Sequence, residues 1–191
     1  MSYEDSACLQ YALRGTNLVI STIPGDAQLA LIDAARRTPS IRRFIPSEFE
    51  GKLSSRPVHD PLDLRNIAGA ITLLQSHRLP YTVLTCGLFY ERFGPGGLGA
   101  YGMGAHCAGA SSAFLVDIGA GAADVVERDR DGKDVVVVMT SMADVARYVA
   151  AMIEMAGVEG MRSWPQEVRV RGDAMTISTL LDVCQSVYRS E

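Results

Sequence analysis

Three short apolar segments, separated by helix-like segments, restrict the folds that this chain can adopt. Residues 17–23, 41–45 and 81–85 are rich in apolar and β-branched side chains, as expected for buried strands. Residues 26–37 and 60–77 carry apolar side chains at the three- and four-residue spacing of amphipathic helices. Strands that alternate with helices form right-handed βαβ units around a parallel sheet. We therefore expect an α/β protein built on a parallel sheet with helices on its faces.

The second half of the chain has a less regular pattern. Half of the 18 glycines fall between residues 94 and 121, which predicts a loop. Residues 124–127 and 134–139 flank the sequence Asp-Arg-Asp-Gly and predict a hairpin. The remaining expected elements are a helix over 141–155 opened by Ser141, a strand over 167–171 and a helix over 178–189.

Composition and charge exclude several classes of function. The formal net charge is −4, so we expect neither nucleic-acid nor anionic-membrane binding. No apolar run has the roughly 18–20 residues that span a bilayer, and the first residues do not resemble a signal peptide. The four cysteines are widely spaced, and the pair His106-Cys107 lacks partners at ligand spacing. We therefore expect a cytoplasmic protein without a metal site or a disulfide framework.

A glycine motif in the loop has the spelling of a dinucleotide fingerprint but not its context. Gly97-Leu-Gly99-Ala-Tyr-Gly102 reads GxGxxG. A phosphate site of this kind needs a strand leading into the turn and a helix starting on the third glycine. Neither the residues before the motif nor the Gly-, Ala- and Ser-rich residues after it have those patterns. A glycine-rich loop over a cleft is the preferred interpretation, and a phosphate-binding role is the alternative.

Longer motifs resemble a known family. Leu18-Val-Ile-Ser-Thr-Ile-Pro-Gly25, then Ile41-Arg-Arg-Phe-Ile-Pro-Ser-Glu-Phe49, then Leu79-Pro-Tyr-Thr-Val-Leu-Thr-Cys-Gly-Leu-Phe89 resemble motifs of the NmrA-like, isoflavone-reductase-like family of atypical short-chain dehydrogenases. In that family the motifs VISxxG, RFIPSEFG and IPYTxxxxGxF recur in this order at similar spacing. Residues 135–155 also resemble the family's later strand and helix.

The resemblance implies a partial Rossmann-type parallel sheet flanked by helices, with a smaller α+β substrate lobe. Residues 1–93 are then the remainder of an NAD(P)-binding Rossmann domain. Residues 94–191 are the glycine-rich loop and the substrate lobe, within the same structural unit. Many family members are NADP(H)-dependent reductases, whereas others are non-catalytic regulators that sense the dinucleotide. NADP or NAD is therefore the implied cofactor, and a small aromatic or carbonyl compound is the implied substrate.

Ligands of open α/β sheets lie beyond the carboxyl ends of the strands, which places the candidate site at three strand ends. The alternative is that these serines and prolines merely terminate the strands. Two residues after the third strand end are candidates for a substrate cleft, with core packing as their alternative: Tyr90 and Phe93. The candidate cofactor-binding residues are Ser21, Thr22, Ile23, Pro24, Gly25, Pro46, Ser47, Glu48, Phe49, Cys86, Gly87 and Phe89.

Departures from the family pattern predict weak cofactor binding and impaired catalysis. Family members begin with a strand and a glycine-rich turn, whereas the match here starts later, so we expect an N-terminally truncated member. The reductases carry a lysine on the helix that matches residues 60–77, but the only lysines here are Lys52 and Lys133. No tyrosine is followed by a lysine four residues later. The catalytic residues are therefore unassigned.

Two other functions stay open. The chain is either a non-enzymatic dinucleotide- or redox-sensing regulator that acts through protein contacts, or an inert fragment. Without further strands beside residues 17–23, an apolar sheet edge would be exposed to a protein partner or to a second copy of the chain.

Overall fold

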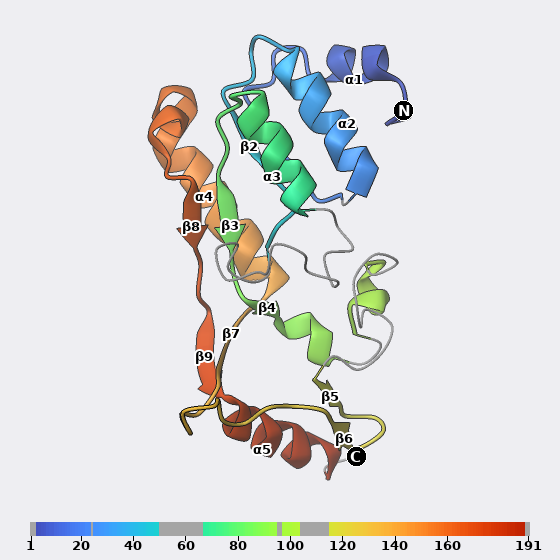
Figure 1. The fold of residues 1–191 in the computed structure, drawn as a ribbon, viewed down its shortest axis with the longest axis vertical. Helices are drawn as coiled ribbons and strands as arrows, with labels where there is room; N and C mark the ends of the chain where they lie inside the picture. Colours follow the sequence, from blue (N-terminus) through green and yellow to red (C-terminus); the bar gives the residue numbers. More distant parts are fainter. Residues whose placement is uncertain (1–2, 24, 50–66, 95–96, 104–114, 190–191) are drawn as a thin grey trace. The chain divides into compact units, whose positions relative to one another are not determined.

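The computed structural model describes residues 3–23, 25–49, 67–94, 97–103 and 115–189, and the chain divides into two compact units (Figure 1). Unit 1 comprises Met1–Thr85 and Arg147–Arg169, and unit 2 comprises Cys86–Ala146 and Val170–Glu191. The units are therefore discontinuous in sequence, unlike the division at residue 93 expected above.

Unit 1 contains the predicted parallel strands. β1 pairs with β2 in parallel, with Val19 opposite Phe44, and a parallel bridge joins Phe44 to Tyr81 at the start of the next segment. β3 pairs in parallel with β8. The order β1-β2-β3-β8 with one strand direction confirms the α/β class. The four strands are β1 (Leu18–Ile20), β2 (Arg43–Ile45), β3 (Val83–Thr85) and β8 (Glu167–Arg169).

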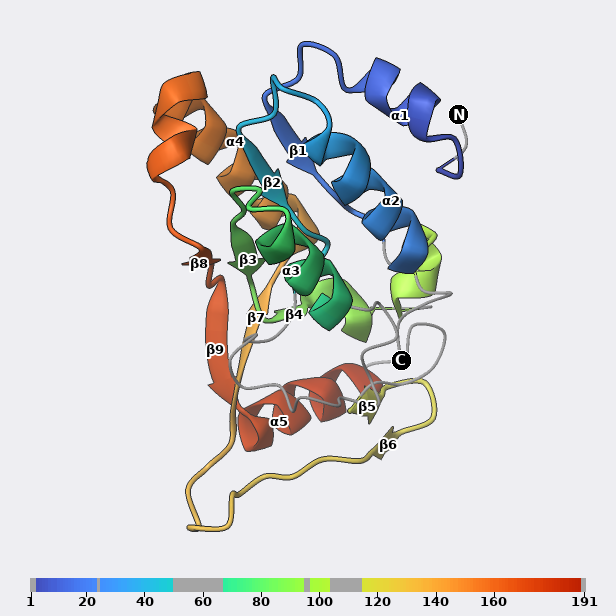
Figure 2. The same cartoon turned by 45° about the horizontal axis from the view of Figure 1, so that its top comes forward.

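The helices of unit 1 supply its core. Figure 2 shows α2 and α3 side by side in front of the strands, and α1 packs against α2. Ile32, Phe44 and Leu74 are completely buried in one apolar cluster between these helices and the strands. Among described residues, the helices are α1 (Ser6–Ala12), α2 (Gly25–Arg36) and α3 (Ile67–Ser76), with a short 3-10 helix η4 (Met161–Ser163) before β8. The first part of the helix predicted over 60–77 lies outside the described residues.

Unit 2 is organised around β7 (Val136–Thr140). β7 pairs in parallel with β4 (Leu88–Phe89) and antiparallel with β9 (Asp173–Thr176). Its core contains Met139, together with residues of the last helix. The other elements are the 3-10 helices η2 (Tyr90–Phe93) and η3 (Gly97–Tyr101), the strands β5 (Val116–Asp117) and β6 (Ala122–Ala123), and the helix α5 (Ile177–Tyr188).

One long helix, α4 (Met142–Gly160), begins in unit 2 and continues into unit 1. Ser141 caps it as predicted, because its Oγ accepts the N–H of Asp144 at 3.0 Å and donates to the Asp144 carboxylate at 2.7 Å. The helix is interrupted at Gly157, whose φ of 57° is not helical.

The predicted hairpin is only partly correct. The turn forms, because Asp129 N–H donates to the Lys133 carbonyl and Val135 N–H donates to the Glu127 carbonyl, both at 2.8 Å. Residues 124–127 are not a strand, however, and β7 pairs with β4 and β9 instead. No helix within the described ranges is both long and apolar enough to cross a lipid bilayer.

Candidate functional site

The first candidate loop leaves the carboxyl end of β1. Ser21 continues the ladder, since its N–H donates to the Ile45 carbonyl at 2.8 Å. Its side chain is 1% exposed and donates to the Ile23 carbonyl at 3.2 Å, so the hydroxyl is already occupied. Thr22 is exposed, and Pro24 lies outside the described residues. Gly25 has a φ of +66°, and no heavy atom lies within 4 Å of the position that a Cβ would take, so a ligand can approach its backbone.

The second candidate loop leaves the carboxyl end of β2 and is fixed by a residue of α2. Ser47 N–H donates to the side-chain oxygen of Gln28 at 2.6 Å, and Glu48 N–H donates to the Pro46 carbonyl at 2.7 Å. Gln28 and Glu48 are completely buried, while Phe49 is half-buried. Because β1 and β2 are parallel neighbours, this loop and the loop after β1 lie at the same edge of the sheet, as the sequence predicts.

The third candidate cluster belongs to unit 2 and is packed against β7. Cys86 is completely buried, and its carbonyl accepts the hydroxyl of Thr140 at 2.7 Å. Gly87 has a φ of +74°, and a Cβ there would lie 2.1 Å from the Val138 carbonyl oxygen. Phe89 is buried in β4. The contact with β7 gives Gly87 a structural reason to be glycine, and a cofactor role for this cluster stays a prediction.

The two candidate substrate residues have different surroundings. Phe93 packs against the apolar core of unit 2, which was the alternative to a place in a cleft. Tyr90 is exposed, but desolvation raises its pKa, and so do its hydrogen bond to Asp173 and the negative charges of Asp173 and Asp144. A tyrosine that donates a proton in catalysis needs a neighbouring cation, which would lower its pKa. The surroundings of Tyr90 have the opposite effect.

The described part of the glycine motif does not have the dinucleotide geometry. Gly97–Tyr101 form the 3-10 helix η3, and the element before it is the 3-10 helix η2 rather than a strand. Likewise, no group of three or more His, Cys, Asp or Glu side chains in the described part of the chain is arranged to hold a metal ion.

Sequence reasoning missed the polar residues that hold the loops and strands together. Gln28, Arg43 and Thr140 are at least 95% buried, and each bonds backbone groups distant in sequence. A polar side chain on the apolar face of a predicted helix was the available signal for Gln28. For Arg43 the signal was an arginine inside a strand pattern.

Parallel strands joined through helices, with two loops at one carboxyl edge, define a Rossmann-type α/β protein of the dinucleotide-binding kind. Comparison with known proteins makes the resemblance specific. Over 93 residues, or 46% of its length, the chain is 33% identical to the probable pinoresinol-lariciresinol reductase 3 of Arabidopsis thaliana, and it covers 30% of that protein. No family model matches the chain.

Solved structures of plant reductases share the fold. Leucoanthocyanidin reductase from Vitis vinifera in a ternary complex aligns with a TM-score of 0.63 and 19% identity, covering 95% of this chain and 57% of that one. The same enzyme bound to NADPH aligns with a TM-score of 0.62 and 18% identity, with coverages of 95% and 56%. An isoflavone reductase aligns with a TM-score of 0.60 and 18% identity, with coverages of 100% and 56%.

The chain thus spans little more than half the length of these structures. The resemblance to the NmrA-like, isoflavone-reductase-like proteins indicated by the sequence motifs is confirmed, and the neighbours include NADP(H)-bound reductases.

Proposed function

We propose that this chain is an NADP(H)-binding protein of the reductase type that binds its cofactor weakly and transfers hydride poorly or not at all. The observation that carries the proposal is the parallel β1–β2 pair, which gathers two candidate loops at one carboxyl edge. The NADPH-bound leucoanthocyanidin reductase of the same fold supports NADP(H) as the ligand.

The residues of this edge fit part of a dinucleotide. Exposed Thr22 can hydrogen-bond a ribose or an amide, and the open backbone at Gly25 leaves room for a ring. The loops over residues 21–25 and 46–49 contain no lysine or arginine to meet a pyrophosphate. Charge-assisted hydrogen bonds are worth about 1.5–3 kcal/mol each, and about 1.4 kcal/mol changes affinity tenfold. We therefore expect a dissociation constant above roughly 100 μM.

The same residues limit catalysis. When bound, the nicotinamide would supply a hydride to an electrophilic carbon of a small aromatic or carbonyl compound, and the protein must then handle a proton. The helix lysine implied by the resemblance is missing, and Tyr90 faces carboxylates. In the described part of the two loops, the one titratable side chain is Glu48, which is completely buried. A positioned acid or base commonly contributes about 10²–10⁴-fold to a rate, so its loss accounts for impaired turnover.

A titration with NADPH, followed by calorimetry and saturation-transfer NMR, tests this function. We expect weak binding in the high micromolar to millimolar range that is lost in Gly25→Leu. The matched control is Gly132→Leu, because Gly132 also has a positive φ and open space around its Cβ position, but lies in a turn of unit 2. Dissociation constants well below 100 μM would refute the weak-site argument. Equal binding by the two variants would refute the placement at Gly25.

A second candidate is a non-enzymatic regulator that associates through the edge of β1. Among the described strands β1 pairs only with β2, and Ile20 at its end is 38% exposed. Unpaired strand edges favour pairing with another chain, and an identical strand of a second copy is the occupant we propose. Light scattering after gel filtration distinguishes this candidate, because a dimer that becomes monomeric in Ile20→Lys supports it. A wild-type chain that is monomeric at high concentration contradicts it.

A further inference from the structure

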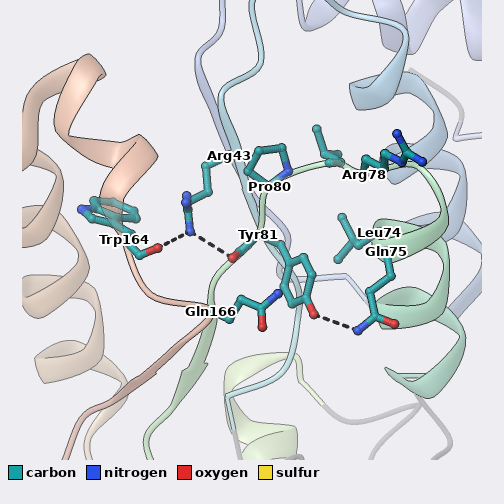
Figure 3. A pocket seen from close by; sticks show the side chains of 9 residues that line it. Arg43, Leu74, Gln75, Arg78, Pro80, Tyr81, Trp164 and Gln166 are labelled. Atoms are coloured by element: carbon teal, nitrogen blue, oxygen red, sulfur yellow. Dashed lines mark hydrogen bonds between the residues drawn. The ribbon is translucent and has the colours of Figure 1, made fainter.

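A cavity of about 390 Å³ lies in unit 1 at the edge of the sheet opposite the candidate cofactor loops (Figure 3). Arg43 is the first residue of β2, Pro80 and Tyr81 lead into β3, and Gln166 precedes β8. These positions are the amino ends of the strands, so the cavity is separate from the carboxyl edge. The lining residues are Arg43, Leu74, Gln75, Arg78, Leu79, Pro80, Tyr81, Trp164 and Gln166.

Arg43 brings a buried positive charge to this cavity. It is 5% exposed, and burial lowers its pKa, which reflects the unfavourable desolvation of the guanidinium. No carboxylate of the described residues pairs with it, and its Nε has no hydrogen-bond acceptor. All its acceptors are neutral oxygens, at 2.8–3.5 Å: the carbonyls of Tyr81, Arg162, Trp164 and Pro165, and the hydroxyl of Thr82. The charge is therefore solvated by dipoles but not neutralised.

Arg78 brings a second positive charge in a conformation that arginine does not favour. It follows α3 in a Schellman motif, in which Leu79 N–H donates to Leu74 and Arg78 N–H donates to Gln75. Its φ is 51°, a left-handed value for which glycine is the usual residue. The side chain is exposed and has no ion pair with a described residue. The helix end thus explains a glycine at this position but not an arginine.

The remaining walls are flat and mostly apolar. Tyr81 is buried, its hydroxyl is bonded to the Gln75 amide at 3.1 Å, and Pro80 lies beside it (Figure 3). Trp164 is half-buried on the other side of Arg43. No aspartate or glutamate lines the cavity. Flat apolar surfaces together with uncompensated positive charge suit an anion that has an aromatic body.

We propose that this amino-edge cavity binds a small aromatic carboxylate. Its ring lies against Tyr81 and Pro80, its carboxylate pairs with the exposed guanidinium of Arg78, and buried Arg43 adds positive potential. Neither the charges nor the walls of this site belong to the candidate cofactor loops, so the proposal does not depend on the proposed function.

Fluorine NMR with 4-fluorobenzoate tests the site, and Trp164 reports where the probe binds because it is the single tryptophan of the chain. We expect saturable binding accompanied by a change in tryptophan fluorescence. Arg78→Gly, in which glycine suits the left-handed backbone, should bind at least fivefold more weakly, whereas Arg78→Lys should stay within about threefold. The control Arg130→Gln removes one charge from an exposed turn of unit 2 and should not alter binding.

Three results would overturn the proposal. The first is equal binding of the neutral 4-fluorobenzamide, which would show that charge is not recognised. The second is wild-type affinity in Arg78→Gly, and the third is binding that leaves the fluorescence of Trp164 unchanged. Excess NADPH should not displace 4-fluorobenzoate, and displacement would contradict the separation of the two edges.

Discussion

Replacement of Gly87 by alanine should destabilise unit 2 strongly. An added Cβ would lie 2.1 Å from the carbonyl oxygen of Val138 and 2.7 Å from its carbonyl carbon. Both are backbone atoms of β7, which is held between β4 and β9 and cannot rotate away like a side chain. Overpacking of this kind costs about 1–3 kcal/mol or more, and alanine at a φ of +74° adds about 1–2 kcal/mol. The expected loss of about 3–5 kcal/mol is a large part of the roughly 5–15 kcal/mol typical of a domain.

The matched control is Gly132→Ala in the same unit. Gly132 has a φ of +76° but no atom within 4 Å of its Cβ position, so only the backbone strain applies there. Denaturant unfolding followed by far-UV circular dichroism, with hydrogen exchange of the β7 amides, measures both variants against the wild type. If the two variants lose equal stability, the close approach of β7 to Gly87 is not what requires glycine, and the reasoning fails.

Three further predictions concern single side chains. Thr140→Val should lose about 2–4 kcal/mol in denaturant unfolding and Thr140→Ser much less, because valine leaves the buried Cys86 carbonyl and the Gly172 N–H without their hydroxyl partner. Arg78→Gly should raise the free energy of unfolding by about 0.5–1 kcal/mol, seen as a higher Tm, whereas an unchanged or lower Tm would contradict strain at this helix end. Tyr90 has a raised pKa in the folded chain, so the unfolded chain loses the proton first and stability should fall as pH rises above 10. Tyr90→Phe should weaken that fall, and an identical pH profile would contradict the environment described.

The parallel core of the fold could be predicted from sequence because its signals are local. The apolar runs of β1, β2 and β3 and the helical periodicity of α2 are contained within each segment, and the βαβ rule then sets the strand direction. β4 and β9 were missed because pairing with β7 defines them. β4 has only two residues, and Asp-Ala-Met-Thr in β9 has no strand-like alternation.

The candidate site was predictable to the same extent. The shared edge of the loops after β1 and β2 follows from strand direction, so sequence could place it. The contact that holds the second loop, Gln28 to the Ser47 amide, joins a side chain to a backbone group 19 residues away. No spacing rule reveals such a contact, because any residue at position 47 except proline offers the same N–H donor.

Arg43 and Arg78 together show how a residue of the fold can be told from a residue of a site. Arg43 joins β2 to residues 162–165, 119–122 positions away, and its acceptors there are backbone carbonyls that every sequence provides. Its presence is explained by the fold, and the positive potential of the amino-edge cavity is a consequence. Arg78 holds nothing together and occupies a backbone conformation that glycine would adopt without strain. A ligand at the cavity accounts for Arg78 where the fold does not, and for this reason the variants at position 78, rather than those at 43, decide the proposal.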